Sequence, residues 1–192
     1  MRTIVWDVDD VLNDLMKLWF EKAWLSEHPE CHLTYKSISE NPPHKLLSVS
    51  LNDYLDSLDK FRFILSQGVI KMDPIPAVVE WFQIHGYKFR HIALTSVPIQ
   101  FAPFSASWVL KHFGHWIRSF HFVPSRRANE KVFSYDSDKA DYLKWWGKAD
   151  LFIDDNPSNV EAVNKIGIHN ILMPRPWNKN TMSISDTLNS IL

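Results

Sequence analysis

The chain has 192 residues, of which 45% are hydrophobic and 14% aromatic, enough for one domain of ordinary size with a substantial core. Its 21 Lys and Arg residues balance 22 Asp and Glu residues, and a net charge of -1 gives no footprint for extended nucleic acid or an anionic membrane. A single cysteine excludes an intrachain disulfide, a cysteine-based zinc site and a redox pair, so a reducing compartment is expected. We see neither a signal peptide nor a transmembrane segment, and the sequence predicts a soluble cytoplasmic protein with a compact substrate.

Short apolar runs rich in strand-forming residues alternate with segments of helical spacing, which is the order of an α/β fold. The first run covers 3–7 and is followed by a long segment, 13–73, with helical stripes and no convincing strand. A first helix is indicated by Leu12, Leu15, Met16, Trp19, Phe20, Ala23 and Trp24, and a second covers roughly 51–65. We interpret 13–73 as a helical cap inserted after the first strand, and 1–12 with 74–192 as the core domain.

The core segments after the cap continue the alternation of helices and strands. One helical stripe begins after Pro74, and a second one ends at Gly114. Asn156 and Pro157 predict a further helix start, because Asn is a favourable N-cap and Pro a favourable first residue. Further strands are predicted at 90–95, 118–123, 150–154 and 169–173, and one last helix after Trp177. The pattern predicts a Rossmann-like parallel sheet flanked by helices.

Acidic residues stand where two of the predicted strands end. Asp7, Asp9 and Asp10 follow the first strand, and Asp154 with Asp155 ends the strand at 150–154. The ligand site of an open α/β sheet lies outside the carboxyl ends of its strands, so the two clusters can converge. Two carboxylates about 4 Å apart repel by roughly 4 kcal/mol at an effective dielectric near 20. Convergence therefore favours a bound hard cation, with Mg²⁺ first because its ligands are oxygens.

The acids belong to four motifs that follow one another along the chain: Asp7-Val8-Asp9, Thr95-Ser96, Lys139 at a helix start, and Asp154-Asp155. Their order and spacing resemble the haloacid dehalogenase (HAD) superfamily of phosphatases over residues 3–176. Within it, the chain is most similar to the 5'(3')-deoxyribonucleotidases, on the stretches Asp73–Pro76, Leu94–Pro98, Ser107–Gly114 and Leu151–Pro157. The family's fold, a HAD-like sheet with a cap, is the one that the pattern also predicts.

The resemblance implies a Mg²⁺-dependent phosphomonoesterase that acts through an aspartyl-phosphate. Asp7 would be the nucleophile and a metal ligand, and Asp9 would be the general acid and base, with its backbone carbonyl on the metal. Phosphoryl oxygens would be held by Thr95, Ser96 and Lys139, while the metal would be ligated by Asp155 directly and by Asp154 directly or through water. Lys131 is a rival of Lys139 for this role.

Some positions depart from the pattern or admit a second reading. Asp10 replaces the family's usual Gly, and we expect it to be structural, because Asp tolerates a positive φ better than most residues. Arg126 and Arg127 either guide an anionic substrate or solvate a loop.

The cap is expected to admit a small phosphate ester, with a (deoxy)nucleoside monophosphate as the favoured example. Its aromatic residues Trp19 and Phe20, with Phe61 and Phe63, are candidates to stack on a nucleobase. Two alternatives stay open: a mutase or phosphotransferase with the same intermediate, and a non-catalytic protein that binds phosphate or nucleotide. Exposed aromatics would equally suit a homodimer.

Overall fold

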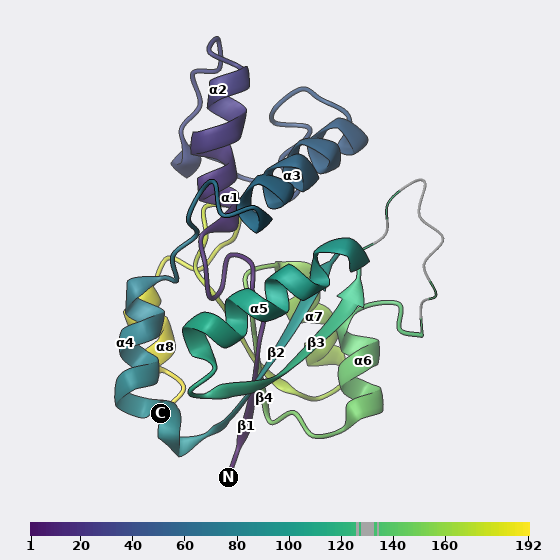
Figure 1. Ribbon diagram of the computed structural model, residues 1–192. Coiled ribbons are helices and arrows are strands. Elements are labelled where there is room, and N and C mark those ends of the chain that lie inside the picture. Colours follow the sequence, from purple (N-terminus) through teal and green to yellow (C-terminus); the bar gives the residue numbers. More distant parts are fainter. Residues whose placement is uncertain (126, 128–132, 134) are drawn as a thin grey trace.

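The computed structural model describes residues 1–125, 127, 133 and 135–192. Five parallel strands form one sheet in the order β3-β2-β1-β4-β5 (Figure 1). The strands are β1 (Thr3–Trp6), β2 (Arg90–Val97), β3 (Ile117–Pro124), β4 (Leu151–Asp154) and β5 (His169–Leu172). The predicted α/β class is confirmed, and all five predicted strands are present with small differences at their ends. Because β1 lies between β2 and β4, the carboxyl ends of these three strands are neighbours.

Helices cover both faces of the sheet, and successive side chains of a strand point to opposite faces and so enter different cores. Ile4, Trp6 and Ile153 pack in the larger core with the helices α4 (Pro76–His85), α5 (Ala102–Phe113) and α8 (Ile184–Asn189). Val5, Leu94 and Phe152 pack in the second core with α6 (Lys139–Trp146) and α7 (Pro157–Lys165). Two short 3-10 turns, η3 (Gly86–Lys88) and η4 (Ile99–Phe101), precede and follow β2.

Two helix starts next to the strand ends are fixed by local capping. The side chain of Asn156 accepts a hydrogen bond from the Ser158 amide at 2.9 Å, so the predicted start of α7 is confirmed. Asp138 caps α6 in the same way, with the Asp141 amide 2.9 Å from its carboxylate. This cap makes Lys139 the first residue of its helix.

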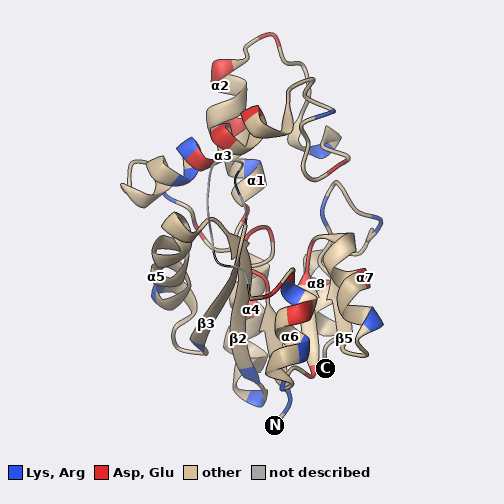
Figure 2. Ribbon diagram, turned by 90° about the vertical axis from the view of Figure 1, so that its right-hand side faces the viewer, with Lys and Arg blue, Asp and Glu red and all other residues tan. Residues whose placement is uncertain are grey.

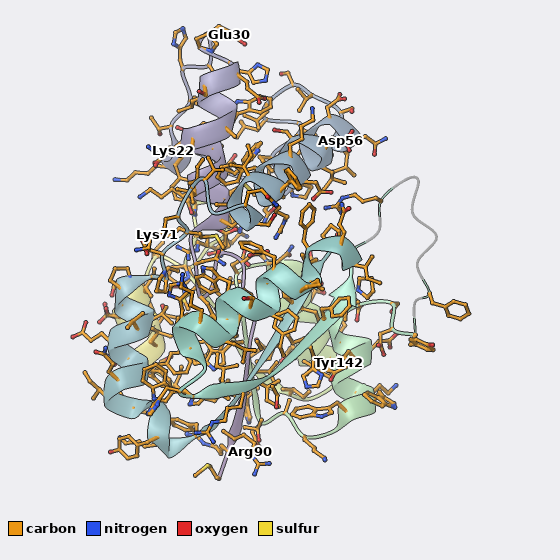
Figure 3. The ribbon with its side chains drawn as sticks, in the orientation of Figure 1. Lys22, Glu30, Asp56, Lys71, Arg90 and Tyr142 are labelled. Carbon is orange, nitrogen blue, oxygen red and sulfur yellow. The ribbon has the colours of Figure 1, made fainter. Side chains whose placement is uncertain are left out.

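The helices of the segment 13–73, the predicted cap, lie beyond the carboxyl ends of the strands (Figure 1). The segment contains α1 (Leu15–Trp19), a π-helical turn η1 (Phe20–Trp24), α2 (Leu25–Glu27), η2 (Tyr35–Ser37) and α3 (Leu51–Ser66). The first predicted helix is thus interrupted by a wider turn, and this turn brings the rings of Trp19 and Trp24 to 5.6 Å. Figure 3 shows Glu30 at the far end of the cap and Arg90 at the opposite end of the molecule. No described helix is both long and apolar enough to cross a bilayer.

Candidate active site

Asp7 and Asp154 meet at the carboxyl edge of the sheet because their strands are adjacent and in register. Trp6 pairs with Ile153, and the Asp7 amide continues the ladder by donating to the Ile153 carbonyl at 2.9 Å. Each carboxylate therefore stands one residue beyond the last pair between β1 and β4. Acidic segments gather at the end of the sheet that faces the cap (Figure 2). The predicted convergence of the two acidic clusters is confirmed.

Lys139 lies between these two carboxylates and bridges them. Its Nζ is 2.7 Å from Oδ2 of Asp7 and 2.7 Å from Oδ2 of Asp154, and its side chain is 2% exposed. Burial alone would lower the pKa of the Lys139 ammonium, but Asp154 and Asp7 raise it above its usual range. The lysine is therefore held charged at the strand ends. Its rival, Lys131, lies outside the described residues.

The acids outnumber this cation. Oxygens of Asp7, Asp154 and Asp155 lie within 4.8 Å of one another, and all three residues are buried. Burial raises the pKa of Asp7 and of Asp155 well above the usual range, with neighbouring carboxylates adding to the effect, while Lys139 opposes it. A buried set of carboxylate oxygens with surplus negative charge is the donor set that a hard divalent cation requires, so the residues present fit Mg²⁺.

The neighbours of the two acids on β4 distinguish them. Asp154 accepts hydrogen bonds from the Asn156 amide at 2.8 Å and from the Asn159 side chain, in addition to Lys139. Asp155 accepts one from the Trp177 indole at 2.8 Å. Asp154 thus orients the lysine, and Asp155 keeps more of its lone pairs for another ligand.

Asp9 lies beside the buried acids but pairs with the cap. Its Oδ2 is 2.7 Å from an Arg62 amino nitrogen (Nη2), and its Oδ1 accepts from the Asn13 side chain at 3.2 Å. Arg62 belongs to α3, and its side chain is 8% exposed. Asp9 raises the pKa of Arg62 above its usual range although burial opposes this. One ion pair thus connects the cap with the loop after β1.

Asp10 has a structural role, as the sequence predicts. Its φ is 60°, so the turn after Asp9 uses the left-handed region, in which Gly is favoured and Asp tolerated. Its carboxylate accepts from the Met16 amide at 3.0 Å, at the start of the cap's first helix, and its carbonyl accepts from Arg175 Nε at 2.6 Å. Burial raises the pKa of Asp10 to about 8.

A cavity of about 270 Å³ opens over these groups, between the strand ends and the cap. Thr95 and Ser96 line it, so the structure brings all the predicted phosphate-binding residues to the same cavity as Asp7 and Asp9, the acids predicted to be catalytic. Other lining residues come from α3 and from the loop after β3: Tyr54, Leu55, Leu58, Arg62, Ser125 and Arg127. Arg127 forms a two-point ion pair with Asp59 of α3, at 2.6 and 2.8 Å, and Arg126 lies outside the described residues.

The cap aromatics that the sequence analysis singles out do not line this cavity. Trp19 and Phe20 are fully buried, and the Trp19 indole donates to Ser57 at 3.1 Å within the cap. Phe61 is buried as well, and Phe63 is 58% exposed on the outer surface. The expectation that Trp19 and Phe20 form the substrate pocket is therefore corrected: these rings build the cap's own core, and Tyr54 is the aromatic residue among the described lining residues.

Sequence reasoning missed Arg62 and Trp177. Arg62 is a single charge in a helix with many charges, and Trp177 lies in a segment without a motif, so neither carries a distinguishing pattern. The spacing of Arg62 from Leu58 and Leu55 is compatible with one face of a helix, but it does not distinguish Arg62 from the other charged residues of α3.

The fold is shared with solved structures of HAD-superfamily proteins. A hydrolase of the haloacid dehalogenase-like family from Streptococcus pneumoniae is 14% identical with a TM-score of 0.61, covering 98% of this chain and 90% of that one. A candidate β-phosphoglucomutase from Thermotoga maritima is 17% identical, with a TM-score of 0.56 and coverage of 100% and 98%. A candidate HAD hydrolase from Bacillus subtilis, bound to magnesium, is 14% identical, with a TM-score of 0.53 and coverage of 99% and 97%. No protein-family model and no curated protein sequence matches the chain.

Proposed function

We propose that the protein is a Mg²⁺-dependent phosphomonoesterase that hydrolyses a small phosphate ester through an aspartyl-phosphate. The observation that carries this proposal is the arrangement of Asp7, Asp154 and Asp155 around Lys139 at the carboxyl edge of the sheet, under a capped cavity. Similarity in fold to HAD-superfamily hydrolases supports the same reaction class.

Asp7 is the group best placed to attack the phosphorus atom. Oδ1 of Asp7 accepts a hydrogen bond from the Val8 amide at 2.7 Å, and Oδ2 forms an ion pair with Lys139. These two contacts fix the orientation of the carboxylate. Attack by Oδ2 would form a bond to phosphorus while the bond from phosphorus to the leaving oxygen breaks. Lys139 would then stabilise charge on the phosphoryl oxygens, with Thr95 and Ser96, which line the same cavity, as hydroxyl donors.

Asp9 is the candidate proton donor to the leaving oxygen and, in the second half of the reaction, the base that activates water. Asp9 lines the cavity, and its carboxylate contacts Arg62 of α3. Water would then break the bond between phosphorus and Asp7, releasing inorganic phosphate and restoring the free carboxylate.

Asp7 and Asp155 would hold the metal, with Asp154 as a further or water-mediated ligand and the Asp9 carbonyl as the family resemblance implies. A bound Mg²⁺ supplies charge that offsets repulsion between the attacking carboxylate and the phosphate dianion.

The test is phosphate release from a panel of phosphomonoesters in Mg²⁺ and in EDTA. The panel includes p-nitrophenyl phosphate, sugar phosphates, and the 5'- and 3'-nucleoside monophosphates that the nucleotidase resemblance favours. Asp7→Asn should lose at least about a thousandfold in turnover while keeping its circular dichroism spectrum and melting temperature. Retained activity in Asp7→Asn would remove the nucleophile assignment.

A phosphoryl transfer to a second substrate is the alternative, and the similarity in fold to a candidate β-phosphoglucomutase favours keeping it. Product analysis separates the two reactions. Free phosphate released stoichiometrically in water supports hydrolysis, whereas interconversion of two esters without free phosphate supports transfer.

A further inference from the structure

Arg62 enters the cavity from the cap and has capacity to bind another group. The residue is buried, and its ion pair with Asp9 joins one nitrogen, Nη2, to Oδ2 at 2.7 Å. Its Nε is buried without a hydrogen-bond partner among the described residues. A guanidinium offers five N–H donors, and a buried donor without a partner destabilises the protein. The Arg62 guanidinium therefore has donors that no described residue uses, and the residue itself lines the cavity.

The other cations of the cavity are differently placed. Lys139 is shared by two buried carboxylates, and Arg127 holds both oxygens of Asp59 and the hydroxyl of Ser125. Arg62 contacts a single carboxylate oxygen, so it is the cation with the most to gain from an anionic ligand.

Arg62 also lies on one particular side of the reaction. Under the proposed function, Asp9 faces the oxygen that leaves with the alcohol, and Arg62 is in contact with Asp9. The guanidinium is thus beside the leaving group rather than beside the transferred phosphoryl group, which Lys139 serves. Leu58 and Leu55 precede Arg62 by one and two turns of α3 and also line the cavity, so they supply an apolar surface for the carbon atoms of a compact alcohol.

We propose that Arg62 determines specificity by binding an oxyanion, carboxylate or phosphate, that the leaving group of the substrate carries. A planar guanidinium matches both anions in two-point geometry. The substrate class is then a small phosphate ester with a second anionic group, in place of an ester with a neutral alcohol such as a nucleoside. This inference rests on the proposed function, because that function defines the leaving side of the cavity.

The test compares three small esters that differ in the charge of the leaving group: 2-hydroxyethyl phosphate, 2-phosphoglycolate and ethane-1,2-diol bisphosphate. We expect the wild-type kcat/KM to favour one or both anionic esters over the neutral one by about ten- to hundredfold, the range of a charge-assisted contact. The carboxylate and phosphate arms identify which oxyanion is preferred. Equal kcat/KM values for the three esters would overturn the inference while leaving the proposed function intact.

Variants assign the selectivity to the side chain. Arg62→Gln should bring the ratio of anionic to neutral kcat/KM close to one, and Arg62→Lys should retain part of it, since the charge remains and the planar fork is lost. Lys60→Gln removes a positive charge from the exposed side of the same helix and should keep the wild-type ratio. Melting curves check that the variants fold. If Arg62→Gln is unfolded, the ratio of anionic to neutral kcat/KM in Arg62→Lys is compared with that of the wild type instead. A ratio unchanged in folded Arg62→Lys and Arg62→Gln would contradict the assignment.

Calorimetric binding to Asp7→Asn in Mg²⁺ separates failure of the inference from failure of the proposed function. Selective binding of the anionic esters without turnover by the wild type would support the anion site and reject hydrolysis. Binding without selectivity, or no binding, together with no turnover, would reject both.

Discussion

Replacing Lys139 with methionine removes the cation that two buried carboxylates share. At 2.7 Å, each of the two ion pairs has a Coulomb energy of about 6 kcal/mol at an effective dielectric near 20. Much of this Coulomb energy offsets the cost of desolvating the buried ammonium, and a Met side chain does not incur that cost. Breaking a buried pair by removing one partner costs about 3–5 kcal/mol, because the charges left behind are uncompensated. We expect Lys139→Met to lose this much free energy of unfolding at pH 8 without Mg²⁺.

The pH dependence of this loss has a defined sign. Burial raises the pKa of Asp7 even with Lys139 present, and removing the lysine raises it further. The Asp7 carboxyl of the variant therefore takes up a proton as the pH falls, and the uncompensated charge disappears. The difference in unfolding free energy between the wild type and Lys139→Met should shrink from pH 8 to pH 5. Mg²⁺ should also narrow it, because a second cation restores part of the missing charge.

Urea unfolding at several pH values, in EDTA and in Mg²⁺, measures these quantities. Lys144→Met is the matched control, because Lys144 lies on the same helix α6 and is exposed. A surface lysine of this kind contributes about 1 kcal/mol or less. If Lys139→Met lost no more than Lys144→Met at pH 8, the buried charge network would not have the energetic role assigned to it.

Two further predictions concern pH. The rise in melting temperature caused by Mg²⁺ should be larger at pH 8 than at pH 5. Burial raises the pKa of Asp7 and Asp155, so the metal must displace protons from these carboxyl groups as the pH falls. A rise in melting temperature that does not depend on pH would contradict the assigned ligands. Burial lowers the pKa of His91, whose Nδ1 accepts from the Trp6 indole at 3.0 Å. Its contribution to stability is thus fully present above about pH 6.5 and is lost as the pH falls through the folded-state pKa, because the unfolded chain binds the proton first. In urea unfolding, the free energy of unfolding of His91→Gln should fall less between pH 7 and pH 5 than that of the wild type. An equal fall in both proteins would show that His91 does not cause the loss of stability at low pH.

Local features of the sequence predicted much of the core. Asn156 and Pro157 predict the start of α7 because capping depends on a few consecutive residues, and the structure places the cap there. Parallel strands bring their carboxyl ends to one edge, so the meeting of Asp7 and Asp154 also follows from a pattern of strands and acids. In both cases the deciding interactions lie within an element or between strands whose pairing the fold class constrains.

The cap was harder to interpret because its helices carry apolar residues on broad faces. Trp19 and Phe20 belong to such a face, and periodicity alone does not distinguish a ring that packs inside the cap from one that faces the cavity. The structure decides this by packing Trp19 against Tyr54 of α3, with the ring centroids 5.2 Å apart. Trp19 also donates to Ser57 of α3, and neither Trp19 nor Phe20 is among the residues that line the cavity.

By itself, the sequence determined the α/β order, the strand ends with their acids, and the helix starts beside them, because these depend on short-range periodicity and capping. Only the tertiary structure decided that Lys139 bridges Asp7 and Asp154, and that Arg62 of the cap reaches Asp9. Arg62 and Asp9 are far apart in the chain, and their contact depends on how α3 docks over the sheet. The rotation and depth of a docked helix are set by the packing of many side chains at once, which no local pattern encodes.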